Sequence, residues 1–153
     1  MITWNELKKV IIKNAIFMNL YRTPSMQKKY DAFQKKVLRH YESMNDYIYC
    51  TVFRYKCEKE KTKFRAIAET KFASLPEIKN QYIITENPFP YDLEKNIAHF
   101  VLWHNSYLST TKVNKILKEH FKSDKILWYR SYRESVPEIN HIHVFVQNTN
   151  SSS

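Results

Sequence analysis

Apolar residues near the start of the chain recur at helical spacing. Thr3 and Glu6 suit a capping box, in which the hydroxyl accepts from the Glu6 N–H and the carboxylate reaches back to the cap. The apolar positions associated with this start are Leu7, Val10, Ile11, Met18 and Tyr21. Their spacing predicts a helix that begins after Thr3.

A second helix is predicted to start at Pro24. Thr23 is a favourable N-cap residue, and proline is accepted at the first helical position because its missing N–H needs no partner there. The predicted buried face carries Met26, Tyr30, Phe33, Val37 and Tyr41. The predicted solvated face carries Lys28, Lys29, Lys35, Lys36 and Arg39. This separation of apolar and basic positions is typical of an amphipathic helix.

The middle of the chain gives weaker patterns. Residues 45–53 favour a strand by propensity, whereas Asp46 could cap a short helix, and the two interpretations stay open. Residues 54–63 form a run of alternating charges, which predicts a solvated loop or a frayed helix.

The second half has the pattern of strands around one helix. Strands are predicted at 82–85, 97–104, 125–130 and 139–147, and a helix capped by Thr110 or Thr111 is predicted to run through Phe121. Two prolines keep the loop 87–92 extended. We therefore predict a single α+β domain over residues 1–147, with two or three N-terminal helices packed on one face of a small, mainly antiparallel sheet and one helix inserted between strands. Residues 148–153 are expected to be a disordered polar tail.

The composition excludes several classes of protein. The 153 residues include no glycine, which removes the P-loop, the dinucleotide fingerprint and the nucleophile elbow, and leaves asparagine or aspartate for turns with positive φ. No apolar run is long enough to span a membrane, and the start lacks the pattern of a signal peptide. Cys50 and Cys57 are too few for a disulfide scaffold, and Cys50 is expected to pack as a small hydrophobe. We therefore expect an intracellular protein in a reducing compartment, cytoplasmic or nuclear.

The chain is strongly basic, with a net charge of +10. Residues 1–79 carry 17 basic and 8 acidic groups, whereas residues 80–153 carry 8 and 7. Such a surface could bind nucleic acid or another polyanion. However, 19 of the 25 basic residues are lysine, and an AT-rich genome would produce the same excess through codon bias. Both interpretations stay open.

An ordered set of short motifs resembles a known family. The motifs are Asn87-x-Phe89-Pro90-Tyr91, Ile97-x-His99-x-Val101-x-Trp103, Ile126-x-Trp128-Tyr129 and Ser135-Val136-x-x-Ile139-x-His141-x-His143-Val144, with weaker agreement at Trp4, Leu20-x-Arg22 and Tyr30. Together they resemble a domain-of-unknown-function family whose fungal members include the N-acetylglucosamine-induced protein. The resemblance covers nearly the whole chain and implies a shared fold. It implies no activity and no catalytic residues, because the family has no established function.

Three histidines form the strongest candidate for chemistry. His141 and His143 lie two apart on a predicted strand, so their side chains project from one face, and His99 lies on another strand. If these strands are neighbours, the three imidazoles could act in catalysis or bind a divalent metal such as zinc, although nothing in the sequence requires a cofactor. Without a metal they could bind a phosphate or move protons, supported by Arg130 or Arg133.

Structural roles compete with these functional ones. Histidines on an apolar strand face are often hydrogen-bonded core residues, and Trp103 and Trp128 are expected in the core although they could stack on a base or sugar. Tyr91 is the better candidate for ligand binding because it lies in a loop next to predicted strands.

Three functions are therefore compatible with the sequence. The favoured one is a pocket of His99, His141, His143 and Tyr91 that binds or acts on a phosphate-bearing or sugar-derived small molecule. The second is a non-catalytic module that binds nucleic acid through the basic helical half. The third is a protein-interaction module, which predicts an exposed apolar patch and no pocket. The oligomeric state is left open.

Overall fold

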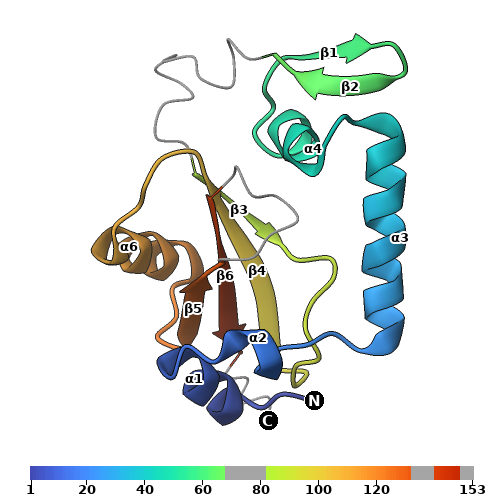
Figure 1. The fold of residues 1–153 in the computed structure, drawn as a ribbon. Helices are drawn as coiled ribbons and strands as arrows, with labels where there is room; N and C mark the ends of the chain where they lie inside the picture. Colours follow the sequence, from blue (N-terminus) through green and yellow to red (C-terminus); the bar gives the residue numbers. More distant parts are fainter. Residues whose placement is uncertain (68–81, 132–139, 149–153) are drawn as a thin grey trace.

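The computed structural model describes residues 1–67, 82–131 and 140–148 (Figure 1). Its helices are α1 (Trp4–Ile12), α2 (Ile16–Asn19), α3 (Pro24–His40), α4 (Met44–Thr51) and α6 (Thr110–Phe121). Its strands are β1 (Cys57–Glu60), β2 (Lys63–Ala66), β3 (Tyr82–Glu86), β4 (Ile97–His104), β5 (Ile126–Arg130) and β6 (Asn140–Gln147). The predicted α+β class is confirmed, and α6 is the helix inserted between strands.

The main sheet has four antiparallel strands in the order β3-β4-β6-β5. β4 lies inside this sheet, as its apolar sequence predicted. Its register with β6 pairs Val101 with His143 and Trp103 with His141, so these four side chains share one face of the sheet. The backbone remains bonded up to Asn148, whose N–H donates to the Asn96 carbonyl at 2.7 Å. Residues 149–153 of the predicted tail lie outside the described residues.

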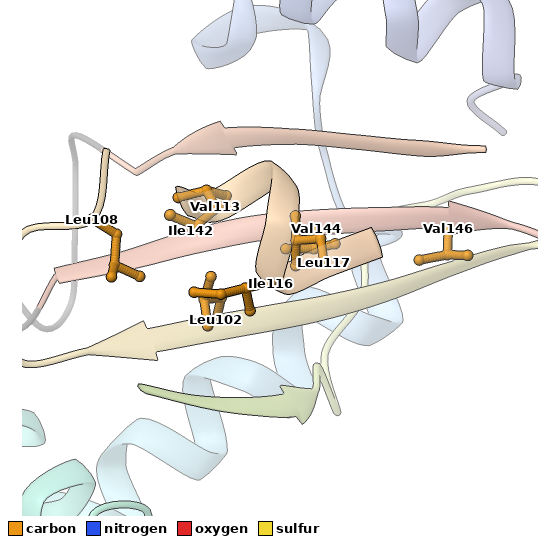
Figure 2. Packing of buried hydrophobic residues seen from close by; sticks show 8 residues of the cluster. All are labelled: Leu102, Leu108, Val113, Ile116, Leu117, Ile142, Val144 and Val146. Carbon is orange, nitrogen blue, oxygen red and sulfur yellow. The ribbon is translucent and has the colours of Figure 1, made fainter. Parts of the chain in front are cut away.

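One face of the sheet is covered by α6. Figure 2 shows the apolar side of this helix over β4 and β6. The buried cluster comprises Leu102, Leu108, Val113, Ile116, Leu117, Ile142, Val144 and Val146. The N-cap of α6 is Ser109, whose hydroxyl accepts from the Lys112 N–H, and not Thr110 or Thr111 as predicted. The opposite face of the sheet carries the histidines.

α1 covers one end of that opposite face. Its Thr3–Glu6 capping box is present as predicted. Leu7 is fully buried beside Tyr129 and Phe145 of the sheet. The helix stops at Ile12 instead of continuing towards Met18, because Asn14 takes a positive φ of 52°.

α3 stands apart from the four-stranded sheet (Figure 1), and its Tyr30 and Phe33 rings pack against Phe89 in the loop between β3 and β4. Thr23 caps α3 and Pro24 is its first residue, as predicted. Residues 44–51 form α4, which settles the open choice for 45–53 in favour of a helix. Ser43, not Asp46, is the N-cap. The buried Asp46 carboxylate accepts from the Ser43 hydroxyl at 2.6 Å and from the Ala66 N–H at 2.9 Å, which ties α4 to β2.

The charge run 54–63 is not a loop or frayed helix, so that prediction was wrong. Its residues 57–60 form β1, which pairs with β2 in a hairpin. The alternating charges fit a strand whose side chains are mostly exposed, and Arg65 bridges Glu58 and Glu60 across the hairpin. The pattern of apolar residues did not predict this strand because neither of its faces is strongly apolar.

Positive φ angles are not confined to asparagine or aspartate, contrary to expectation. Besides Asn14, they occur at Arg54, Lys61 and Lys122. The glycine-free chain therefore places long, exposed side chains in the left-handed region at a helix end or tight turn, at a cost of about 1 kcal/mol each. Lys122 is the C-cap of α6, a position that glycine usually occupies.

The two cysteines also depart from expectation. Cys50 and Cys57 form a disulfide bond that links the last turn of α4 to the start of β1. Cys50 is therefore not an isolated small hydrophobe, and the cysteine count no longer argues for a reducing compartment. None of the helices in the described part of the chain has the length and apolar character needed to cross a bilayer.

Candidate functional site

A cavity of about 800 Å³ separates α3 and α4 from the histidine face of the sheet. α3 and α4 therefore do not pack flat against this face, whereas α1 covers one end of it. The aromatic lining of the cavity comprises Tyr30, Phe33, Tyr47, Phe89, Tyr91, Trp103 and Tyr129. Its polar lining includes Arg22, Gln34, Thr85, Glu86, Asn87, His141 and His143. A cavity of this size and mixed lining suits a small organic molecule.

His99 and His143 form a hydrogen-bonded pair at the sheet wall of this cavity. His99 Nε2 lies 2.9 Å from His143 Nδ1. The pair forms because neighbouring strands β4 and β6 present these side chains on the same face. His99 is 3% exposed and lies behind His143, which lines the cavity. The condition set in the sequence analysis is met, since β4 and β6 are neighbours and bring His99 and His143 together.

Backbone contacts assign the protons of this pair. The Tyr91 N–H donates to His99 Nδ1 at 3.3 Å, so that nitrogen must be the acceptor of a neutral ring. The ring proton of His99 is then on Nε2 and is donated to His143 Nδ1. His143 in turn carries its own proton on Nε2, the nitrogen that is not bonded to His99. Asn87 Nδ2 lies 3.4 Å from His99 Nε2, but both groups are donors in this assignment, so the contact is not a hydrogen bond.

Burial keeps both rings uncharged. Loss of hydration, with a smaller effect of the Arg22 charge, lowers the pKa of His99 from 6.5 to about 3. Burial also holds the pKa of His143 well below its usual range, and the neighbouring histidines and Arg22 add to this effect. Neutral histidines donate and accept hydrogen bonds without supplying charge. The pair is therefore suited to hydroxyl or carbonyl groups and does not attract a phosphate.

His141 lies beside this pair, nearer to Trp103. Its ring centroid is 5.6 Å from that of His143 and 5.0 Å from that of Trp103. Trp103 packs against buried residues, as expected, but it also lines the cavity, and its indole N–H donates to Thr85 Oγ1 at 3.0 Å. Trp128 is on the α6 side of the sheet, where its indole N–H donates to Asn114.

Tyr91 lies close to both the histidine pair and the Arg22 guanidinium. Its hydroxyl is 2.7 Å from the Tyr129 hydroxyl, and its ring lies 4.8 Å from His99 and 5.7 Å from His143 between centroids. Burial raises the pKa of the Tyr91 phenol. The guanidinium carbon of Arg22 lies 5.4 Å from the centre of the same ring. The double-proline loop thus places Tyr91 in the site, as its sequence context suggested.

Arg130, one of the two arginines predicted to support the histidines, is directed away from them. Arg130 borders the cavity, but its guanidinium donates to the Leu108 carbonyl at 2.6 Å and lies over Tyr107 and Trp128 on the α6 side. The reason is the alternation of β5, which puts Arg130 and Trp128 on one face and Tyr129 on the other. Arg133 lies outside the described residues.

The two acidic residues that closely follow Tyr91 in the sequence are engaged in contacts with the N-terminal segment. Asp92 pairs with the N-terminal amine of Met1 at 3.2 Å, and Glu94 accepts from the Trp4 N–H at 3.1 Å. Among residues 1–67, 82–131 and 140–148, no group of three histidine, cysteine or acidic side chains is arranged to hold a metal ion. The ring nitrogens of His99 and His143 that face each other share a proton in this arrangement.

Sequence reasoning missed Arg22 as a residue of the site. Arg22 lies in the turn between α2 and α3, far from the histidines along the chain. The signal that could have found it is its place in the motif Leu20-x-Arg22, which belonged to the family resemblance.

Comparisons with known proteins agree with this fold. Residues 3–147 match the family described as "Protein of unknown function (DUF3605)". The chain belongs to this family. The predicted resemblance is thereby confirmed, and the match includes every residue placed at the cavity. The family description assigns no activity.

Two relatives extend the comparison. The chain is 24% identical over 173 residues to N-acetylglucosamine-induced protein 1 of Candida albicans (strain SC5314 / ATCC MYA-2876), covering 95% of this chain and 68% of that protein. It also resembles the solved structure titled "Crystal Structure of HTC1", with a TM-score of 0.63 and 21% identity, over 97% of this chain and 86% of the other. At this identity the structural match supports the fold alone.

Proposed function

We propose that this chain binds a sugar-derived small molecule in the cavity between its N-terminal helices and its sheet. His143 and His141 contact the ligand's oxygen atoms, and His99 acts as a positioning residue behind His143. The observation that carries the proposal is the chain of directed hydrogen bonds from the Tyr91 N–H through His99 to His143, which ends at the wall of the cavity.

The chemistry of the wall favours this class of ligand. Neutral imidazoles offer one donor and one acceptor each, which matches the hydroxyl and carbonyl groups of a sugar. Aromatic rings such as Tyr91 and Trp103 offer flat apolar surfaces for the C–H faces of a sugar ring. The name of the Candida albicans relative records induction by N-acetylglucosamine, so amino sugars come first among the compounds to test.

The test is a binding panel read by calorimetry and thermal unfolding. It contains N-acetylglucosamine, glucosamine, glucose and zinc, each titrated into the whole chain. A ligand specific for the folded state stabilises it by about 2.7 kcal/mol at a hundredfold excess over Kd. We expect an amino sugar to bind and the double variant His141→Ala/His143→Ala to weaken binding by about tenfold or more, since each lost hydrogen bond contributes about 1 kcal/mol.

The matched control is His40→Ala/His120→Ala, which removes two exposed histidines outside the cavity. The control should bind like the unmodified chain. Histidine NMR resonances of the unmodified chain supply a second readout that does not depend on whether the variant folds. Unchanged His141 and His143 resonances with every sugar would refute the proposal. A response to zinc that EDTA reverses would instead assign the histidines to a metal.

A second candidate function is polyanion binding by α3. This helix exposes Lys28, Lys29, Lys35, Lys36 and Arg39. Oligonucleotide binding through this face should fall steeply with salt and weaken in Lys28→Gln/Lys29→Gln, yet be unaffected by loss of His141 and His143. Binding that ignores the lysine changes would reject this candidate.

An intracellular location stays part of the proposal. Trapping of free thiols in intact cells tests it, because a reducing compartment should leave Cys50 and Cys57 reduced.

A further inference from the structure

We propose that the Arg22 guanidinium forms an anion subsite of the cavity and takes the phosphate group of a sugar phosphate. This inference rests on the proposed function and refines it from a sugar to a phosphorylated sugar. The neutral pair of His99 and His143 cannot supply charge to a phosphate, so a phosphorylated ligand would draw on a cation elsewhere in the lining. Arg22 lines the cavity and lies in the turn that precedes α3.

The Arg22 side chain is held in place before any ligand binds. Its Nε donates to the Phe89 carbonyl at 2.7 Å, and its Cζ lies 4.3 Å from the Tyr30 ring centre and 5.4 Å from that of Tyr91. The hydrogen bond uses the Nε side of the group. The two Nη groups supply the fork that binds a phosphate through two parallel bonds. A guanidinium already fixed between two rings loses little conformational freedom on binding.

The charge of Arg22 is not neutralised by a salt bridge within the described part of the chain. Arg65, by contrast, is paired with Glu58 and Glu60. Glu86 is the single carboxylate among the described lining residues, and it is exposed to solvent. The Arg22 charge also acts across the site, because it contributes to the lowered pKa of both buried histidines after the larger effect of burial.

The arrangement brings two chemically different groups close to one ring of the cavity. Tyr91 contacts both the histidine pair and Arg22. A ligand that carries both hydroxyls and a phosphate matches these two groups. The shared Tyr91 contact keeps both groups near one bound molecule.

The first test uses inorganic phosphate as the probe and the Arg22 side chain as the reporter. Titration of phosphate into the ¹⁵N-arginine-labelled chain should shift the Arg22 Nε–H resonance in a saturable way. Arg39, exposed near the end of α3, is the internal control and should not saturate. This measurement needs no sugar, so it separates failure of the subsite from failure of the proposed function. An Arg22 resonance that behaves like that of Arg39 overturns the inference.

The second test compares glucose with glucose 6-phosphate in the unmodified chain and in two variants. We expect the phosphorylated sugar to bind about tenfold more tightly, a preference that Arg22→Gln abolishes and Arg39→Gln retains. The glutamine amide can still donate towards the Phe89 carbonyl, and urea unfolding checks that the variant is folded. A phosphate preference that survives Arg22→Gln would place the anion elsewhere and overturn the inference.

Discussion

Acidification below pH 7 is expected to destabilise the fold through its buried histidines. In the unfolded chain His99 has a pKa near 6.5, whereas burial lowers it to about 3 in the folded chain. Between these values the unfolded state binds a proton that the folded state does not accept. Stability is therefore retained above pH 6.5 and lost progressively as the pH falls towards 3.

The size of the effect follows from the two pKa values. From pH 7 to pH 5, His99 alone should remove about 2 kcal/mol of unfolding free energy, because each pH unit below the unfolded pKa costs about 1.4 kcal/mol. His143 and His104, whose pKa values burial also lowers, act in the same direction. The comparison of variants isolates His99 from these contributions.

The assay is urea unfolding at pH 7 and pH 5 for the unmodified chain, His99→Gln and His120→Gln. Glutamine can still donate to His143 but does not titrate. Between pH 7 and pH 5, His99→Gln should therefore lose about 2 kcal/mol less unfolding free energy than the unmodified chain. His120 is exposed on α6, and its replacement should leave the loss unchanged. Equal losses in the unmodified chain and His99→Gln would refute the reasoning that His99 is neutral when folded.

Three further predictions concern the framework around the cavity. Reduction of the Cys50–Cys57 disulfide, or the change of both cysteines to serine, should lower the unfolding free energy by about 2 kcal/mol, because the bond closes a short loop in the unfolded chain; an unchanged urea midpoint would contradict this. Asp46→Ala should cost about 2–4 kcal/mol, since it leaves the buried Ala66 N–H without its acceptor, whereas the exposed Asp31→Ala on α3 should cost little. Leu117→Ala should lower the unfolding free energy by about 2–5 kcal/mol because Leu117 is buried, whereas Leu38→Ala should lower it by less than about 1 kcal/mol because Leu38 is 43% exposed. Similar losses for the two variants would count against the assigned α6 core.

Local patterns in the sequence were sufficient for most helices and strands. The caps at Thr3 and Thr23 are decided by side chains within three residues of the backbone they bond, so they can be predicted without tertiary contacts. The shared face of His141 and His143 follows from strand alternation alone. For segments without a clear apolar period, the prediction stayed open, as for α4, or was wrong, as for the β1–β2 hairpin. There, distant bonds such as Asp46 to Ala66 select the structure.

The site itself depended on contacts that no local pattern contains. That His99 meets His143 depends on β4 and β6 being neighbours and on their register, which long-range packing against α6 and α1 determines. The positions of Arg130 and Arg22 depend on such contacts as well. The alternation of β5 turns Arg130 towards α6, while the segment before α3 brings Arg22 to Tyr91. The sequence by itself determined which side chains share a strand face or a helix face. Only the tertiary structure decided which faces meet and where a cavity remains, because that outcome depends on how all the apolar faces are buried together.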